Sequence, residues 1–125
     1  MCDERRVLVV EDVAPIRDLL HDVLTYRGYL VTLAHHGAHG VQLIPHGRPC
    51  VMLLDLEMPV MNGWKLVSAY RKTPLPHVAI IVMTMSRDGA HHAAALQVAD
   101  YIPKPFDLDH MLDVVDCLVR AHQAI

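Results

Sequence analysis

The sequence predicts an α/β fold in which helices cover both faces of a parallel sheet. Short apolar stretches of strand length alternate along the 125 residues with longer stretches that repeat apolar residues at helical spacing. The stretch 51–59, VMLLDLEMP, is apolar without alternation up to Asp55, which is typical of a strand buried on both faces. Strands that alternate with helices join into a parallel sheet through right-handed crossovers, so we expect one domain of this class.

The amino-terminal part of the chain predicts a strand, a helix and a second strand. The first strand spans Arg6–Val10, and Pro15 opens the helix at a position where a missing N–H costs little. Gly28 ends this helix, and Leu30–Ala34 forms the second strand. One face of the helix is expected to be buried, because apolar residues recur on it every three or four positions: Ile16, Leu19, Leu20, Val23 and Leu24.

The middle of the chain predicts a weak helix, a strand and a further helix. Over 37–49, Gly40 and Pro45 both lower helical stability, so a short or distorted helix is expected there. The third strand, Val51–Asp55, follows it. The next helix begins at 62–63 and carries three large apolar or aromatic residues: Trp64, Val67 and Tyr70.

The carboxy-terminal part predicts two strands and two helices. The fourth strand, 78–84, is almost wholly apolar, and an alanine-rich helix over 88–97 has little bulky apolar surface and is expected to be loosely held. A short fifth strand over 100–102 is placed outermost, because Pro103 is tolerated only at a sheet edge or a strand end. The last helix starts from an Asp107 N-cap and buries one apolar face: Leu108, Met111, Leu112, Val115, Leu118 and Val119.

The composition argues against several classes of function. The net charge is −3 and Lys and Arg do not cluster, which argues against direct nucleic-acid binding. No apolar run reaches the roughly 20 residues of a membrane span, and no signal-peptide pattern precedes the first strand. The three cysteines lack CxxC spacing, so neither a disulfide framework nor a zinc site is indicated, and a cytoplasmic protein is expected.

Acidic residues follow two of the predicted strands. Glu11 and Asp12 come after the first strand, and Asp55 ends the third. Taken alone, Asp55 could merely cap or turn the chain. Sites in such sheets form at the carboxyl ends of strands, and if the first and third strands are neighbours, the three carboxylates converge and repel one another. A hard divalent cation removes this conflict, and Mg²⁺ suits a shallow site that keeps several waters.

Four motifs lie in order at the predicted strand ends. They are VLVVED with Pro15 following, LLDLEMPVMNG, the strand that ends at Thr84, and YIPKPF with its Lys104 and Pro105. Over about residues 6–120 the chain therefore resembles the receiver domain of two-component response regulators, in the single-domain form of chemotaxis regulators. The resemblance implies a flavodoxin-like, doubly wound (βα)5 fold, with a five-stranded parallel sheet of order 2-1-3-4-5. We expect a single receiver domain over residues 1–125 without an output domain, because the sequence ends soon after the last predicted helix; this domain is either a stand-alone receiver or a receiver cut from a longer protein.

The resemblance implies a role for each acidic residue and for one lysine. Asp55 matches the phosphoacceptor, whose carboxylate attacks the phosphoryl group of a kinase phosphohistidine to give an acyl phosphate. Asp12 and Asp55 match direct Mg²⁺ ligands, with the backbone carbonyl of Glu57 as a third and Glu11 acting through water; Mn²⁺ is expected to be able to replace Mg²⁺. Lys104, otherwise interpreted as an exposed lysine, would help to neutralise the phosphoryl oxygens in transit.

The resemblance also implies a switch. Thr84, which could otherwise be an ordinary strand residue, would donate its hydroxyl hydrogen to the phosphoryl group once Asp55 is modified. Tyr101 would then turn inward into the space that Thr84 vacates. The change would reach the face formed by the fourth helix, the fifth strand and the fifth helix. A cis peptide between Lys104 and Pro105 is implied as well.

The sequence departs from the usual pattern of the family in three places, at Met85, at Glu57 and at the pair Gln97 and Val98. Met85 stands where a small residue is common, so its side chain is expected to narrow access for water or small phosphodonors and to slow self-dephosphorylation. Glu57 either adds a carboxylate near the phosphate or points to solvent. Gln97 and Val98 replace small residues before the fifth strand, so the loop there is expected to differ in shape.

The function implied is phosphorelay signalling and not enzymatic turnover of a substrate. The expected partners are a sensor histidine kinase or a phosphotransfer protein, and a downstream effector protein or an output domain that this chain lacks. No direct contact with nucleic acid or membrane is expected. The protein is expected to be a monomer or a weak homodimer that pairs through the face of the fourth helix, fifth strand and fifth helix.

Three other functions remain as alternatives. A Mg²⁺-dependent phosphoesterase would use similar acids, but no DxD pair stands at Asp55, because position 57 is Glu, and no cap domain is present. A degenerate receiver would act purely by binding, yet the five expected functional side chains are present: Glu11, Asp12, Asp55, Thr84 and Lys104. A nucleotide-binding flavodoxin-like domain would need a glycine-rich loop after the first strand, which is missing.

Overall fold

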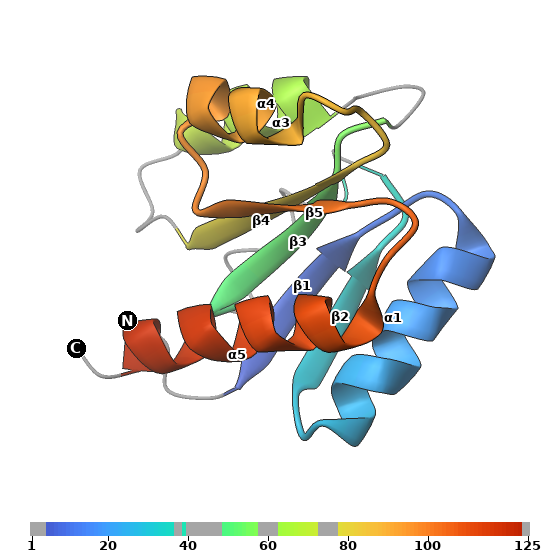
Figure 1. Ribbon diagram of the computed structural model, residues 1–125. Helices are drawn as coiled ribbons and strands as arrows, with labels where there is room; N and C mark the ends of the chain where they lie inside the picture. Colours follow the sequence, from blue (N-terminus) through green and yellow to red (C-terminus); the bar gives the residue numbers. More distant parts are fainter. Residues whose placement is uncertain (1–4, 37–38, 40–48, 58–62, 73–77, 124–125) are drawn as a thin grey trace.

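The computed structural model describes residues 5–36, 39, 49–57, 63–72 and 78–123. Its strands are β1 Arg6–Val10, β2 Leu30–Ala34, β3 Val51–Asp55, β4 Ala79–Thr84 and β5 Asp100–Pro103. All pair in parallel in one sheet of order β2-β1-β3-β4-β5 (Figure 1). The predicted α/β fold, with its strand order 2-1-3-4-5, is therefore confirmed.

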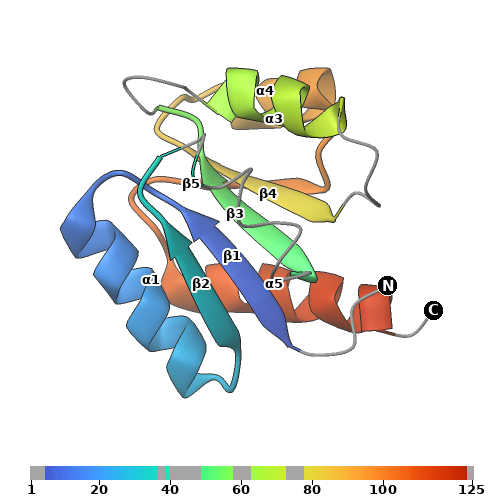
Figure 2. The same cartoon turned by 180° about the vertical axis from the view of Figure 1, so that it is seen from behind.

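Helices cover both faces of the sheet, as Figures 1 and 2 show from opposite sides. On one face lie α1 (Ala14–Tyr26) and α5 (Leu108–Gln123), and on the other lie α3 (Gly63–Arg71) and α4 (Gly89–Leu96). The helix expected at 37–49 falls almost wholly outside the described residues. Helices on both faces bury β3 and β4 along their whole length, which explains why these strands are apolar up to their last residues, Asp55 and Thr84.

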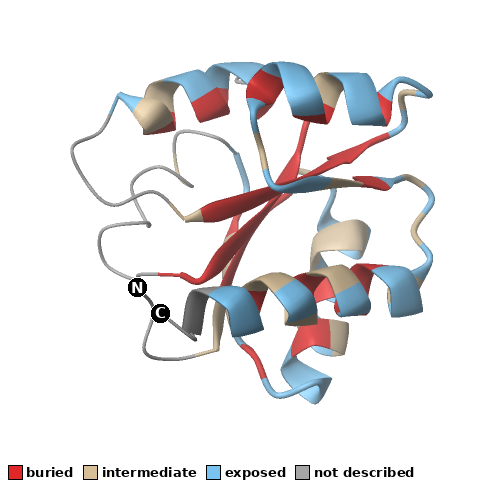
Figure 3. Cartoon of the chain, turned by 60° about the vertical axis from the view of Figure 1, so that its left-hand side comes forward, coloured by how far each residue is buried: buried red, intermediate tan, exposed pale blue. Residues whose placement is uncertain are grey.

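Successive side chains of each central strand enter two different apolar layers. In β3, Val51 and Leu53 pack toward α1 and α5, whereas Met52 and Leu54 pack toward α3 and α4. All four side chains are fully buried, and Figure 3 shows the same burial along the sheet and on the inner sides of the helices. Two packed layers hold the carboxyl ends of the strands in fixed positions, and Asp55 is the end of β3.

The element boundaries follow local signals in the sequence. Gly28 has a φ of +97°, a conformation that a side chain disfavours, and it ends α1. Asp107 caps α5 by accepting a hydrogen bond from the His110 N–H at 3.2 Å. β5 ends at Pro103 and pairs with β4 alone, which confirms its expected place at the sheet edge.

Two large side chains lie closer to solvent than the helical pattern suggested. Leu19 on α1 is 43% exposed, because α1 lies beside the outer strands and buries only a narrow stripe centred on Leu20 and Leu24. Trp64 on α3 is 37% exposed, and Leu66 is buried instead. Helical spacing identifies the apolar side of a helix, but the neighbouring elements decide how much of that side is covered.

Two expectations drawn from composition can be compared with the structure. In the part of the chain that is described, no helix is both long enough and apolar enough to cross a membrane. Cys50, just before β3, is disulfide-bonded, although the number and spacing of the cysteines did not indicate a disulfide. Cys117, on the exposed side of α5, is a free cysteine.

Candidate functional site at the carboxyl edge of the sheet

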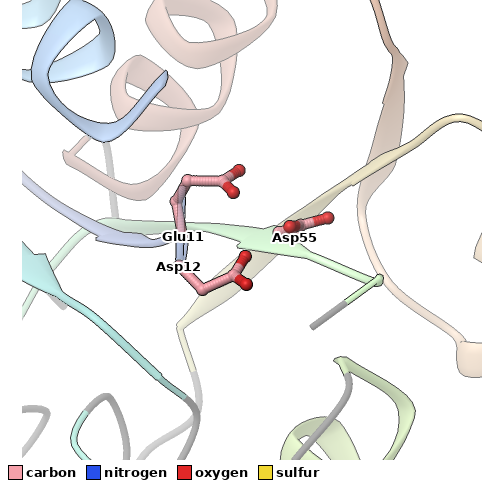
Figure 4. Close-up of side chains that lie close together, drawn as sticks. All are labelled: Glu11, Asp12 and Asp55. Atoms are coloured by element: carbon pink, nitrogen blue, oxygen red, sulfur yellow. The ribbon is translucent and has the colours of Figure 1, made fainter. Parts of the chain in front are cut away.

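Three acidic side chains lie together at one edge of the sheet, and we refer to Glu11, Asp12 and Asp55 as the acidic cluster. They follow or end the neighbouring strands β1 and β3. One carboxylate oxygen of each lies within 4.8 Å of the other two (Figure 4). Glu11 and Asp55 are buried, at 0% and 1% exposure. This burial, together with the nearby charge of Asp55, raises the pKa of Glu11 to about 7.

The connection between β1 and α1 holds Glu11 at both its backbone and its side chain. Its N–H donates to the carbonyl of Ala34 on β2 at 3.1 Å, and its Oε1 accepts from the Val13 N–H at 3.2 Å. Arg17 of α1 donates from Nη1 to the Glu11 carbonyl at 3.0 Å. Sequence reasoning did not single out Arg17, because an arginine in the first turns of a helix carries no distinctive signal.

Lys104 reaches the acidic cluster from the loop after β5. Its backbone N–H donates to the Thr84 carbonyl at 2.9 Å, and its Nζ lies 3.1 Å from Asp55 Oδ1 and 3.2 Å from Glu11 Oε2. Burial lowers the pKa of Lys104, but the carboxylates of Asp55 and Glu11 outweigh it and raise the pKa above its usual value. The peptide bond to Pro105 is cis. Lys104 is thus a buried ion-pair partner, with only 11% of its side chain exposed.

The acidic cluster fits a hard cation. Among the described residues, Asp12 Oδ1 is buried and has no hydrogen-bond partner. A buried carboxylate oxygen left in this way costs free energy unless a cation or water binds it. Lys104 forms ion pairs with Glu11 and Asp55 but not with Asp12. In proteins, Mg²⁺ is usually bound by one or two carboxylates and keeps several water ligands, which is consistent with this cluster.

A second set of polar contacts lies where β4 ends. Glu57 Oε1 accepts a hydrogen bond from the Thr84 hydroxyl at 2.8 Å and another from the Met85 N–H at 2.6 Å. Thr84 Oγ1 in turn accepts from the Ser86 N–H at 3.0 Å. The Glu57 side chain makes these contacts although the residue is exposed, and its effect on access stays a prediction. Met85 contributes its backbone, its side chain is 69% exposed, and the expected effect of that side chain on access stays a prediction.

Tyr101 lies on β5, half-buried, with its ring against the start of α4. A β-carbon added to Gly89 would lie 2.6 Å from Tyr101 Cδ2 and 3.4 Å from Thr84 Cγ2. The Tyr101 ring therefore packs against the Gly89 backbone in the space that a β-carbon would need, and the Thr84 methyl lies beside the same position. Sequence reasoning missed Gly89, because a glycine that opens a helix is common and has no distinguishing signal.

The fold and the acidic cluster together define a flavodoxin-like α/β domain with a carboxylate-lined edge. The sequence model of the response regulator receiver domain matches residues 7–116. The chain therefore belongs to the family of response regulator receiver domains, which serve two-component phosphorelay signalling and bind Mg²⁺.

Relatives of known name or structure resemble most of the chain. The response regulator MprA of Mycobacterium ulcerans is 34% identical over 117 residues, which are 92% of this chain and 50% of that protein. The chain thus spans about half the length of the curated relatives it matches. A receiver domain from Bermanella marisrubri is 30% identical, with a TM-score of 0.84 over 94% of this chain and 99% of that one. TrrA of Thermotoga maritima, in complex with Mg²⁺-BeF, is 28% identical, with a TM-score of 0.80 over 91% and 98%.

Replacing Asp12 with asparagine is expected to raise the melting temperature in magnesium-free buffer, because it removes one charge from the crowded acidic cluster. A gain of about 1 kcal/mol in the free energy of unfolding corresponds to about 4 °C for a domain of this size. The same change should abolish stabilisation by Mg²⁺, which for the wild type is about 1.4 kcal/mol at roughly ten times the dissociation constant. Scanning calorimetry with and without Mg²⁺ measures both effects.

The matched control is Asp113→Asn, which removes the same charge from the exposed side of α5. It should leave the response to Mg²⁺ unchanged. An Asp12→Asn variant that gains no stability without Mg²⁺, and still gains stability with it, would show that Asp12 lies outside the metal site.

Proposed function

We propose that Asp55 accepts a phosphoryl group from a phosphohistidine of a sensor histidine kinase or of a phosphotransfer protein. The observation that carries this proposal is the setting of Asp55. Its carboxylate is buried at the end of β3, lies 3.1 Å from the Lys104 ammonium, and adjoins Glu11 and Asp12. A carboxylate that must attack an anionic group needs positive charge at this place, and Lys104 together with a cation on the acidic cluster would provide it.

In the transfer, an Asp55 carboxylate oxygen attacks the phosphorus in line with the bond to the histidine nitrogen. The O–P bond forms as the N–P bond breaks, and the imidazole leaves with the electron pair and takes up a proton from water. The product is an acyl phosphate on Asp55. The Lys104 ammonium stays beside the reacting oxygens and offsets the charge of the transferring group, and the burial of Asp55 and Lys104 strengthens this interaction.

The residues that would hold Mg²⁺ are Asp12 and Asp55 directly, the backbone carbonyl of Glu57 as a third ligand, and Glu11 through water. The bound ion supplies further positive charge to the transferring phosphoryl group. Glu57 already lies close to Asp55, because its N–H donates to Asp55 Oδ1 at 3.0 Å. This bond fixes the turn that follows β3 and so sets the direction of the Asp55 carboxylate.

Phosphorylation would be read out through Thr84 and Tyr101. The new phosphoryl oxygens would attract the Thr84 hydroxyl, and the Tyr101 ring, which already borders Thr84 across Gly89, would repack against it. Tyr101 lies on the edge strand β5 and its ring packs against α4, so the change would reach the face formed by α4, β5 and α5. We infer that a downstream effector protein, or an output domain joined to this one, recognises that face, which is also where a weak homodimer would form.

Intact-protein mass spectrometry tests the acceptor. Incubation with Mg²⁺ and acetyl phosphate is expected to add the mass of one phosphoryl group to the wild type, and to add nothing to Asp55→Asn or when EDTA replaces Mg²⁺. Asp113→Asn serves as the charge-matched control and should be modified like the wild type. If the Asp55→Asn variant also gained a phosphoryl group, Asp55 would not be the phosphoacceptor. A wild type that gains nothing, also with Met85→Ala, would favour a domain that acts by binding alone.

A further inference from the structure

We propose that the Glu57 carboxylate takes the place of the phosphoryl group while Asp55 is unphosphorylated. It accepts the hydrogen bonds of the Thr84 hydroxyl and the Met85 N–H, at the connection between β4 and α4, and it must be displaced when Asp55 is phosphorylated. This inference rests on the proposed function of Asp55 and adds a residue that controls it. Glu57 would thereby set how readily the site accepts a phosphoryl group or any small anion that imitates one.

The two donors that contact Glu57 have one hydrogen each to donate. The Thr84 hydroxyl has one hydrogen to donate, and it donates that hydrogen to Glu57 Oε1 at 2.8 Å. The Met85 N–H likewise has a single hydrogen, directed to the same oxygen at 2.6 Å. The Thr84 oxygen is itself fixed by the Ser86 N–H at 3.0 Å. Both donors are therefore used, and a phosphoryl oxygen can receive them only if Glu57 gives them up.

The Thr84 hydroxyl is also buried. Thr84 is 2% exposed, so its hydroxyl cannot rely on bulk water for a partner. A buried hydroxyl needs an acceptor, and an anionic oxygen is a stronger acceptor than a neutral one. Glu57 supplies such an oxygen before any phosphate is present. The Thr84 hydroxyl and the Met85 N–H are therefore already oriented to bind an anion, and in the free protein that anion is the Glu57 carboxylate.

The backbone of Glu57 is held close to Asp55. Glu57 stands two residues after Asp55, and its N–H donates to Asp55 Oδ1 at 3.0 Å. This bond holds the backbone of Glu57 beside the acceptor, so its carboxylate competes with an incoming anion at a high effective concentration. The competitor and the phosphoryl group are also both negative. Like charges this close would not share the same two donors.

At any moment, therefore, only a fraction of the molecules has a site that can bind an anion. The apparent affinity for an anion equals the intrinsic affinity multiplied by the fraction of molecules in which Glu57 has left the donors. Removing the Glu57 carboxylate should therefore tighten binding of a phosphoryl analogue, although it removes a polar group from the site. A residue that merely helped to bind the analogue would have the opposite effect.

Titration with beryllium fluoride in the presence of Mg²⁺ tests the inference, because this anion binds a carboxylate in the shape of an acyl phosphate. Glu57→Ala is expected to lower the dissociation constant by on the order of tenfold, since competition for two charge-assisted hydrogen bonds disappears. The matched control is Asp88→Asn, which removes a charge from the exposed α4 N-cap that makes no side-chain cap hydrogen bond. It should change the constant by less than about twofold, as expected for a screened surface charge.

The outcomes separate the two proposals. Wild type and Glu57→Ala binding equally well would overturn the inference and leave Asp55 as acceptor. Binding by neither would overturn the role of Asp55, and the inference with it. Hydrogen exchange of the Met85 amide in the free protein gives a readout that needs no anion: Glu57→Ala should speed it about tenfold or more, on the scale of one lost charged hydrogen bond. An unchanged rate would overturn the inference by itself.

Discussion

Lys104→Met is expected to lower the free energy of unfolding in magnesium-free buffer by about 3 kcal/mol, or the melting temperature by roughly 10 °C. The Lys104 ammonium forms ion pairs with both Glu11 and Asp55, and only 11% of its side chain is exposed. Removing one partner of a buried pair leaves the other charges without compensation. Methionine keeps a similar unbranched stem, so the loss reports the charge and not the packing.

The same substitution should slow phosphate uptake by about a hundredfold, the usual effect of removing one donor to a developing charge. Lys72→Met is the matched control, since Lys72 is exposed beyond the end of α3. Adding Mg²⁺ should restore part of the lost stability, because the ion brings positive charge back to the acidic cluster. Equal melting temperatures for Lys104→Met and Lys72→Met would mean that the ion pairs of Lys104 contribute nothing to the stability of the fold. Calorimetry and time-resolved mass spectrometry provide the two measurements.

The strand ends could be predicted because apolar runs mark buried parallel strands, and such runs stop where the sheet stops. Asp55 illustrates this, since it is the first charged residue after four fully buried ones and is the last residue of β3. The order of the strands could not be read from the runs. It was implied by the resemblance to receiver domains, and it is this order that places β1 beside β3 and brings Glu11 to Asp55.

The directions of side chains at the site were harder to predict. Glu57 was open to two orientations, because spacing along the chain does not say whether a flexible side chain finds donors nearby. The donors that decide the matter, the Thr84 hydroxyl and the Met85 N–H, belong to a strand end far along the chain. Gly89 was missed for a related reason. Its importance comes from the Tyr101 ring packed against it, and no local pattern records a contact between α4 and β5.

Gly63→Ala is expected to be among the most damaging single substitutions in this chain, lowering the free energy of unfolding by about 3 kcal/mol. A β-carbon there would lie 2.6 Å from Leu56 Cδ2, 2.8 Å from Leu56 Cα and 2.9 Å from the Asp55 carbonyl oxygen. Two of these atoms belong to the backbone, so α3 would have to move away from the end of β3. Crowding against the backbone of Asp55 and Leu56 would also disturb the position of the Asp55 carboxylate, so phosphate uptake should fall as well.

Gly28→Ala distinguishes crowding from backbone strain. Gly28 has a φ of +97°, but a β-carbon there meets nothing within 4 Å, so a cost of about 1 kcal/mol is expected from conformation alone. Urea unfolding of both variants gives the comparison, and equal losses would contradict a steric role for Gly63. If crowding dominates, Gly63→Ala alone should also lose the stabilisation by Mg²⁺. Gly63 would then be required for the geometry of the acidic cluster although it is not part of that cluster. The reason is that the first turn of α3 packs directly on the backbone of Asp55 and Leu56.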